Sequence, residues 1–313
     1  MHTRQKADCE MSSSAANKII DGLMERYRER VPDVQAIIDR MISQGLIRSA
    51  ADIENDHIAF RTMGVPYLGI RSLEKVFLHL GWVRRDFYHF PEKKLDAWWY
   101  SPPTPRLPRI FISELKVDLL TPDCARIIRS YTDEVTSDPV DEIDLHRAEA
   151  VVEFLHRGLW RTPTWADWQR LSGESEYAAW VIYNRYYLNH FTISVHNLPA
   201  PWNTVSRFNE FLLEGGFRLN DSGGLVKTSR DGLLLQSSTV ARRVDATFDD
   251  GRGGTEVHAI PGSYVEFAER RVLPEHSGLP PEKIGREHRR DGFEAANADR
   301  IFESTYRQQT DKR

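Results

Sequence analysis

The hydrophobic and polar positions of this chain change rhythm several times, and each change predicts a different kind of element. Residues 16–48 repeat apolar side chains three and four positions apart, and Pro32 marks a joint between two helices. The stretch "HIAFR" (57–61) alternates instead, so that His57 and Arg61 point to the same side of a short strand. The pattern therefore predicts helices in the N-terminal part of the chain and strands from about residue 55.

The same kind of reading predicts the elements that follow the first strand. Up to residue 117 they are a helix over 72–82 and strands over 82–90, 94–103 and 109–117. A mostly helical stretch comes next and extends to about residue 185. The later elements are a strand over 190–196, a helix over 204–217, and strand candidates over 224–229, 232–248 and 262–272.

Strand, helix and three further strands thus occur twice, which indicates an internal repeat of a βαβββ unit. Three pairs of positions mark the repeat: His57 with His190, Gly81 with Gly216, and Glu114 with Glu266. A longer hairpin around "DDGRGG" is expected in the second copy. In such units the first and last strands lie centrally, so their side chains can converge.

The predicted fold class is α+β: paired βαβββ modules form a curved sheet around a metal cavity, with N-terminal helices and a helical insertion. Residues 1–18 are expected to be a disordered lead-in, and residues 19–313 to be a single composite domain. The predicted segments of this domain are a helical segment (19–50), the first module (51–117), the helical insertion (118–185), the second module (186–273) and a C-terminal extension (274–313).

Composition narrows the class of protein. The chain has 313 residues, 40% of them hydrophobic, and a formal charge of −4, which gives no electrostatic footprint for nucleic acid.

No segment is apolar for long enough to cross a bilayer, and the N-terminus lacks the hydrophobic centre of a signal peptide. The expected location is cytoplasmic. With two cysteines, any metal must be held by His, Asp and Glu.

Three residues on the central strands are candidate metal ligands, namely His57, His190 and Glu266. Two neutral imidazoles and one carboxylate on one side of an ion are typical of non-heme Fe(II) enzymes that activate O₂, although zinc also accepts three such ligands. Glu269 is the rival carboxylate, but period two places it on the opposite face of its strand.

Five stretches carry a family resemblance: "DHIAFRTMG", "RIFISELKV", "YYLNHFTISVH", "GSYVEFAERRV" and "DGFEAANADRIFESTY". In this order they resemble the hydroxyglutarate synthase family, also called 2-oxoadipate dioxygenase/decarboxylase, in its compact form. The family belongs to the glyoxalase-like vicinal oxygen chelate superfamily. The resemblance covers roughly residues 50 to 306.

The resemblance implies a set of roles. Fe(II) would be held by His57, His190 and Glu266, and Arg61 would bind the distal carboxylate of the substrate. The implied partners are a small 2-oxo dicarboxylate, 2-oxoadipate by resemblance, and O₂. The implied reaction releases CO₂ and returns oxygen to the shortened chain as 2-hydroxyglutarate.

Four further residues are expected near the site. Glu114 holds the repeat position of Glu266 and is interpreted as a supporting residue or a structural ion pair. His196 is interpreted as a cavity wall or a hydrogen-bonding residue. Tyr264 and Ser237 are candidates to line the pocket.

Three alternatives stay open at this point. The first is a glyoxalase-like metal-dependent isomerase or lyase that uses no O₂. The second is a non-catalytic protein that binds a small acid. The third is a di-iron helical bundle, because Glu54 with His57 and Glu153 with His156 both show the Glu-x-x-His spacing.

Overall fold

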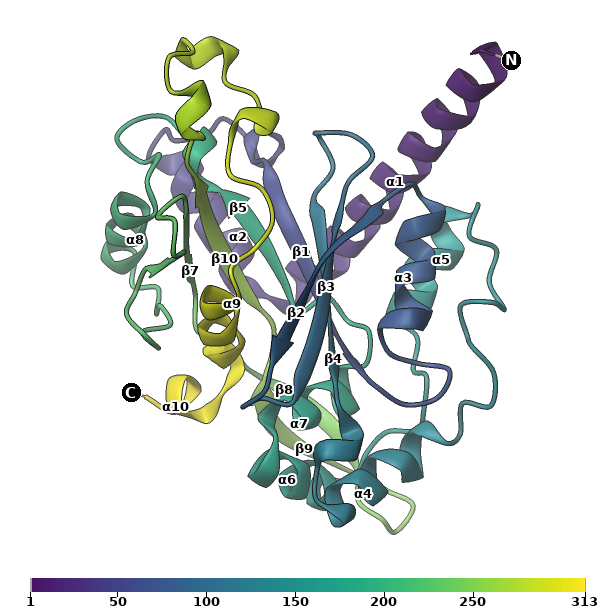
Figure 1. Cartoon of the computed structure of the whole chain (residues 1–313). Helices are drawn as coiled ribbons and strands as arrows, with labels where there is room; N and C mark the ends of the chain where they lie inside the picture. Colours follow the sequence, from purple (N-terminus) through teal and green to yellow (C-terminus); the bar gives the residue numbers. More distant parts are fainter. Residues whose placement is uncertain (1, 313) are drawn as a thin grey trace. The chain divides into compact units, whose positions relative to one another are not determined.

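Most strands and helices follow one another in the order that the hydrophobic pattern predicts. The computed structural model describes residues 2–312, and side chains from residue 14 to residue 312 (Figure 1). Where the sequence predicts one composite domain, the contacts within the chain define two units. Unit 1 comprises Met1–Glu29, Ala59–Asn189 and Arg243–Pro261, and unit 2 comprises Arg30–Ile58, His190–Arg242 and Gly262–Arg313.

Unit 1 contains the first βαβββ module, a group of helices and one hairpin. Its elements are α1 (His2–Arg30), the second half of β1 (Asn55–Met63), α3 (Ile70–His79), β2 (Val83–Phe90), β3 (Leu95–Ser101), β4 (Arg109–Leu115), α4 (Pro122–Thr132), α5 (Ala148–His156), α6 (Trp165–Glu174), α7 (Glu176–Asn184), β8 (Arg243–Asp249) and β9 (Thr255–Pro261). The module strands lie in the order β2-β3-β4-β1, so the first and last strands of the module are neighbours.

Alternation along β1 places successive side chains against different helices of unit 1. The Phe60 ring packs against Phe77 of α3, with 5.4 Å between the ring centroids. The next side chain, Arg61, lies over the rings of Tyr177 and Trp180 in α7, at 5.2 and 5.3 Å. The alternation along the strand therefore predicts correctly that these two neighbouring side chains lie on opposite faces of the sheet. Both faces are buried.

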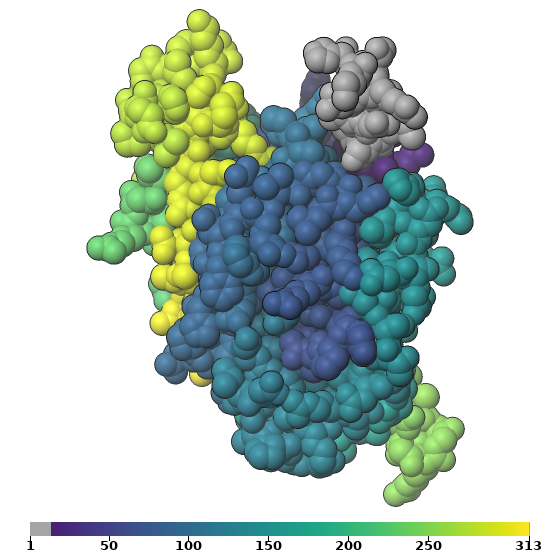
Figure 2. Space-filling view, turned by 45° about the vertical axis from the view of Figure 1, so that its right-hand side comes forward, coloured from purple at the N-terminus to yellow at the C-terminus, as the bar shows by residue number. Residues whose placement is uncertain are grey.

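The hairpin of β8 and β9 is an insertion that the sequence predicts only in part. The stretch 232–248, predicted as one strand candidate, forms two strands, because the chain leaves the sheet of unit 2 after Ser238. Within unit 1 the hairpin is fixed by aromatic contacts: Trp165 of α6 stacks on His258, with 4.0 Å between centroids. Its tip stands away from the helices at the lower right of Figure 2.

Unit 2 contains the second module and the C-terminal region. Its elements are α2 (Pro32–Ser43), the first half of β1, β5 (His190–Ser194), α8 (Val205–Glu214), β6 (Lys227–Thr228), β7 (Leu234–Ser238), β10 (Tyr264–Arg270), α9 (Ala295–Ile301) and α10 (Arg307–Thr310). The strands lie in the order β1-β5-β10-β7-β6. The first and last strands of this module, β5 and β10, are again neighbours.

Two helices identify the two faces of the sheet in unit 2. Phe267 of β10 packs on Phe208 of α8, with 5.2 Å between centroids, so α8 covers the face of the odd-numbered residues. On the other face, Asn297 of α9 donates a hydrogen bond to Gln236 of β7 at 3.0 Å. Glu266 lies on this second face, because it alternates with Phe267.

The lead-in predicted for residues 1–18 differs from the structure. Helix α1 runs from His2 to Arg30 without a boundary at residue 18. Ala16 is fully buried, and Ile19, Leu23 and Tyr27 continue the same buried stripe at helical spacing. This buried stripe accounts for the helix from residue 16 onward, where the sequence also predicts it. Among residues 2–312, no helix is both long and apolar enough to span a membrane.

One glutamate in each module accepts a hydrogen bond from the start of that module's helix. In unit 1 the backbone N–H of Ile70, the first residue of α3, donates to Glu114 at 2.9 Å. In unit 2 the N–H of Val205, the first residue of α8, donates to Glu269 at 2.9 Å. A carboxylate there pairs an open N–H and complements the helix dipole. The repeat partner of Glu114 is therefore Glu269, and the predicted pairing with Glu266 is wrong.

We expect Glu269→Ala and Glu114→Ala each to lower the free energy of unfolding by about 1–3 kcal/mol, because each leaves a helix N–H without its partner. Urea denaturation would measure this. Glu275→Ala, at an exposed position of unit 2, is the control and should stay within about 0.5 kcal/mol of the parent chain. Equal stability of Glu269→Ala and Glu275→Ala would contradict the capping role.

Candidate metal centre

Three side chains from three neighbouring strands of unit 2 meet at one place. His57 comes from β1, His190 from β5 and Glu266 from β10. Their exposed fractions are 1%, 6% and 1%, so all three are buried. Because each strand is paired with the next, the three positions are set by the sheet itself. The structure thus brings together the three residues that the sequence proposes as ligands.

The spacing of the donor atoms suits a metal ion. Nε2 of His190 lies 3.3 Å from Nε2 of His57 and 3.1 Å from Oε2 of Glu266. Nε2 of His57 lies 3.5 Å from Oε1 of Glu266. Bonds of about 2.1 Å from one ion place two neighbouring ligand atoms about 3.0 Å apart in an octahedron and about 3.4 Å apart in a tetrahedron. The distances of 3.1 and 3.3 Å fall in this range, and the distance of 3.5 Å lies just above it.

The charge around the three donors also favours a cation. Glu266 and Asp56 contribute two buried carboxylates, whereas Arg270 contributes one buried positive charge. Burial lowers the pKa of His57, but the carboxylates of Glu266 and Asp56 outweigh this effect and the pKa is raised. The donor set of two imidazoles and a carboxylate is the one found in Fe(II) oxygenases, and zinc accepts it as well.

The carboxylate of Glu266 is oriented by an amide. Nε2 of Gln236 donates to Oε1 of Glu266 at 2.6 Å. Gln236 is itself held from α9, where Asn297 donates to its Oε1 at 3.0 Å. Such a chain of hydrogen bonds fixes how the carboxylate faces an ion. The sequence pointed to the neighbouring Ser237 as a pocket residue, but not to this contact between Gln236 and a candidate ligand.

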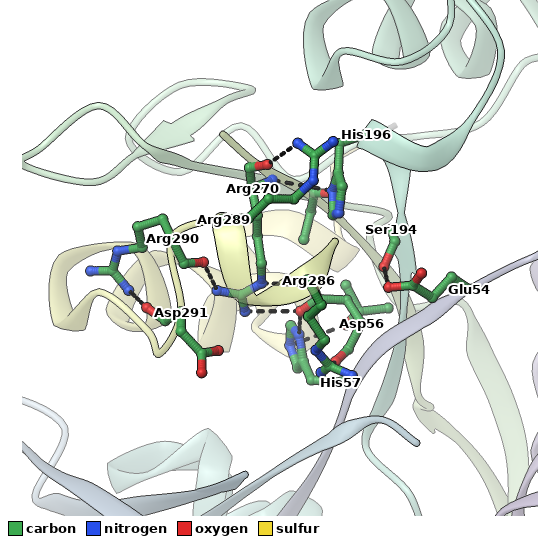
Figure 3. A network of polar contacts seen from close by, with 12 residues as sticks. Glu54, Asp56, His57, Ser194, His196, Arg270, Arg286, Arg289, Arg290 and Asp291 are labelled. Atoms are coloured by element: carbon green, nitrogen blue, oxygen red, sulfur yellow. Dashed lines mark hydrogen bonds and ion pairs between the residues drawn. The ribbon is translucent and has the colours of Figure 1, made fainter. Parts of the chain in front are cut away.

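The imidazole of His57 is contacted on three sides. Nδ1 lies 2.8 Å from Oδ1 of Asp56, and Thr192 lies 3.1 Å from Nε2 through its hydroxyl. Phe293 meets the ring edge to face, with 4.8 Å between centroids. Figure 3 shows Asp56 between His57 and Arg270. Sequence reasoning missed Asp56, although an acidic residue directly before a candidate ligand was a usable signal.

Tyr264 lies beside the second imidazole. Its ring stands 4.9 Å from that of His190, centroid to centroid, with 34° between the planes. The register explains this contact, because Tyr264 pairs directly with His190 across the parallel strands. The ring packs with Ala241 and Ile301 as well. The structure therefore places this predicted pocket residue next to His190, one of the three candidate ligands.

Ser237 lies on the wrong face for the role predicted from the sequence. It pairs with Phe267, and its hydroxyl donates to Asn209 of α8 at 2.7 Å. It is therefore on the side of the sheet that α8 covers, opposite to Glu266. The predicted contribution of Ser237 to the pocket is wrong, because the even-numbered residues of β7 face the candidate ligands.

His196 and Glu269 lie outside the group of donors. Nδ1 of His196 accepts the backbone N–H of Arg270 at 3.2 Å, and burial lowers the pKa of this imidazole to about 4. Glu269 caps α8, as the opposite strand face requires. The structure thus gives His196 a hydrogen-bonding role, and it removes Glu269 as the rival carboxylate.

Glu114 and Arg61 belong to unit 1, whereas the three donors belong to unit 2. Besides capping α3, Glu114 lines a cavity of about 230 Å³ in unit 1, and burial raises the pKa of its carboxyl. Its role in the structure is therefore local to the first module. Arg61 is 1% exposed and lies against the aromatic rings of α7.

The di-iron bundle does not fit the structure. It needs its Glu-x-x-His pairs on helices, but His57 lies in strand β1. Glu54 does not face that histidine either, because it accepts hydrogen bonds from Ser194 at 3.1 Å and Asn197 at 2.6 Å. A strand places residues three apart on opposite faces, so the spacing in "ENDH" cannot assemble one site.

Comparisons with known proteins agree with this architecture. The sequence model of a family described as 2-oxoadipate dioxygenase/decarboxylase matches residues 19–279. A rice protein (Oryza sativa subsp. japonica) named 2-oxoadipate dioxygenase/decarboxylase, chloroplastic/amyloplastic, is 43% identical over 307 residues, which cover 94% of this chain and 80% of the relative.

Solved structures give the same result. The crystal structure of hydroxyglutarate synthase from Oryza sativa in complex with 2-oxoadipate matches with a TM-score of 0.85 and 42% identity, over 96% of this chain and 94% of that chain. A protein from Ralstonia eutropha JMP134, described as of the glyoxalase superfamily, is similar in fold, with a TM-score of 0.71 at 20% identity over 91% and 87% of the two chains. The predicted α+β, glyoxalase-like fold class is confirmed. The chain belongs to the 2-oxoadipate dioxygenase/decarboxylase family.

Proposed function

We propose that this protein is an Fe(II)-dependent enzyme that converts 2-oxoadipate and O₂ to 2-hydroxyglutarate and CO₂. The observation that carries the proposal is the buried group of His57, His190 and Glu266 in a chain of this family. The reaction balances without a further reductant, since one carbon leaves as CO₂ and the shortened chain takes up oxygen. The substrate therefore supplies its own 2-oxo acid group.

His57, His190 and Glu266 would hold the iron, which would supply activation of O₂ and a point of attachment for the 2-oxo acid. The chain's own contribution is positional. Gln236 keeps the carboxylate of Glu266 turned toward the imidazoles. Burial of the donors excludes bulk water, which strengthens every electrostatic interaction at the site.

Arg61 is the residue we propose for the distal carboxylate of the substrate. It follows His57 by four positions on the same strand, which corresponds to about 13 Å of backbone. A guanidinium recognises a carboxylate with two parallel hydrogen bonds, and aromatic faces such as those of Tyr177 and Trp180 restrain its plane. Arg61 is thus suited to bind one carboxylate group of a dicarboxylic acid.

A cytoplasmic location remains a prediction from the sequence. The rice relative is named as a chloroplast and amyloplast protein. Fractionation of cells that produce the full-length chain would test the location directly.

Replacement of any one donor should remove the metal. We expect His57→Ala, His190→Ala and Glu266→Ala each to lower affinity for Co²⁺, a spectroscopic substitute for Fe²⁺, by at least about 100-fold, because a donor is lost. Optical titration would measure the affinity. His146→Ala, at an exposed histidine of unit 1, is the control. Parent-like affinity in any of the three variants would remove that residue from the site.

The activity itself is tested by following three species together. Fe²⁺-loaded protein with 2-oxoadipate in air should consume O₂ and release CO₂ and 2-hydroxyglutarate in equal amounts. Conversion without O₂ uptake would support the isomerase or lyase alternative. Saturable binding of 2-oxoadipate without conversion would support the binding-protein alternative. Either of these results would contradict the proposal.

The role of Arg61 predicts a loss that depends on the substrate. We expect Arg61→Ala to raise KM for 2-oxoadipate about 10- to 100-fold, the range for loss of a charge-assisted hydrogen-bonding pair. 2-Oxohexanoate, which lacks the distal carboxylate, should be affected far less, and metal affinity should not change. Arg85→Ala, at an exposed arginine of β2, is the control. An equal loss for both substrates would refute the assignment.

A further inference from the structure

A buried ion pair lies directly behind the candidate ligand His57. Asp56 and Arg270 have side chains that are each 1% exposed. Nε of Arg270 donates to Oδ2 of Asp56 at 2.7 Å, and Nη2 donates to Oδ1 at 2.9 Å. This is a two-pronged contact, the geometry that gives an arginine–carboxylate pair both strength and direction. The carboxylate of Asp56 is thereby fixed in its plane.

The same carboxylate holds the imidazole. Oδ1 of Asp56 lies 2.8 Å from Nδ1 of His57. A carboxylate held by a guanidinium only accepts hydrogen bonds, so the nitrogen facing it carries the proton. The other nitrogen, Nε2, then presents its lone pair on the opposite side of the ring, where His190 and Glu266 lie at 3.3 and 3.5 Å.

The guanidinium of Arg270 is held from its far side by the C-terminal region. Its Nη1 donates to the carbonyl oxygens of Arg290 at 3.1 Å and Gly292 at 2.7 Å. Four of the five N–H donors of an arginine are thus in use. The chain that accepts these bonds continues to Phe293, whose ring meets His57. Figure 3 shows Arg270 between Asp56 and this part of the chain.

Two more arginines secure the backbone of this pair. Nη2 of Arg286 donates to the carbonyl oxygen of Asp56 at 3.2 Å. Nη1 of Arg289 donates to the carbonyl oxygen of Arg270 at 2.8 Å. The segment 286–293 therefore holds both strands of the pair, β1 and β10, by side chains and by carbonyl groups. All of these contacts lie within unit 2.

We propose that Asp56 and Arg270 are positioning residues for the metal: Arg270 fixes Asp56, and Asp56 fixes the ring orientation and the Nδ1–H tautomer of His57, so that Nε2 binds the ion. Neither residue touches the ion or the substrate. The inference rests on the metal site of the proposed function, which it deepens by naming what sets the direction of one ligand.

The substitution Asp56→Asn tests this with little change of shape. One of the two oxygens of the side chain becomes an NH₂ group. Because both oxygens of Asp56 accept from Arg270, the NH₂ group faces an N–H donor of Arg270 in either orientation. Placed toward His57, the NH₂ also requires Nδ1 to accept, which moves the ring proton to Nε2 and blocks the metal. We expect affinity for Co²⁺ to fall about 10- to 100-fold, as for other partners of metal-bound histidines.

Glu54→Gln is the matched control. It removes the same charge two residues away in the same unit, at a carboxylate that accepts from Ser194 and Asn197 and does not touch His57. Its affinity for Co²⁺ should remain within about twofold of the parent protein, as expected for a change at a carboxylate that contacts none of the candidate ligands. An equal fall in both variants would show a general charge effect and overturn the positioning role.

The contribution of Arg270 is tested by combining variants. Arg270→Lys keeps the charge but loses the two-pronged contact, so affinity should fall in the same direction. Because both residues act along one path, the double variant Asp56→Asn/Arg270→Lys should bind Co²⁺ about as well as Asp56→Asn alone. Losses that multiply would show two independent effects and contradict the proposal.

A measurement on the parent chain does not depend on whether the variants fold. In zinc-loaded protein labelled with ¹⁵N-histidine, His57, identified by its absence in His57→Ala, should carry its proton on Nδ1 and bind zinc through Nε2. Binding through Nδ1 would overturn the inference. If the parent chain binds neither Co²⁺ nor Zn²⁺, the metal site of the proposed function fails. If Asp56→Asn binds as tightly as the parent, only this inference fails.

Discussion

The parallel pairing of β10 with β5 in one register is the constraint on which the candidate metal centre depends. It sets Tyr264 opposite His190 and Glu266 opposite Thr192, so the carboxylate arrives beside the imidazole from a segment 76 residues further along the chain. A slip of one residue would turn Glu266 to the face that α8 covers and would bring Phe267 to the donors. The register is held from the other side as well, because β10 also pairs with β7.

Hydrogen bonds to the donor side chains fix the torsions that strand pairing leaves free. Strand pairing determines on which face of the sheet a side chain lies and beside which residue, but it leaves the torsions of the ring and of the carboxylate free. Gln236 sets the carboxylate of Glu266, and Asp56 with Arg270 sets the ring of His57. Arg270 offsets the charge of Asp56, whereas the carboxylate of Glu266 faces the two imidazoles. This carboxylate favours a cation between the three side chains.

Period two and the repeat predicted most strands of the two modules and, together with the family resemblance, the three candidate donors. Both signals fail where a contact is remote in sequence. Glu114 and Glu266 look equivalent by order along the chain, but the bond from each module helix goes to Glu114 and Glu269. Ser237 shows a related limit. Alternation predicts that neighbouring side chains lie on opposite faces of the strand, but only the pairing with β10 shows which of them face the donors. Asp56 is adjacent to a ligand, yet its function follows from Arg270, 214 positions away.

The most direct test of the account is the position of the metal in crystals of the Fe²⁺-loaded protein, read from anomalous scattering at the iron edge under anaerobic conditions. We expect one strong peak within about 2.3 Å of Nε2 of His57, Nε2 of His190 and a carboxylate oxygen of Glu266. A peak bound to other side chains, or a loaded protein whose iron does not touch these three residues, would contradict it.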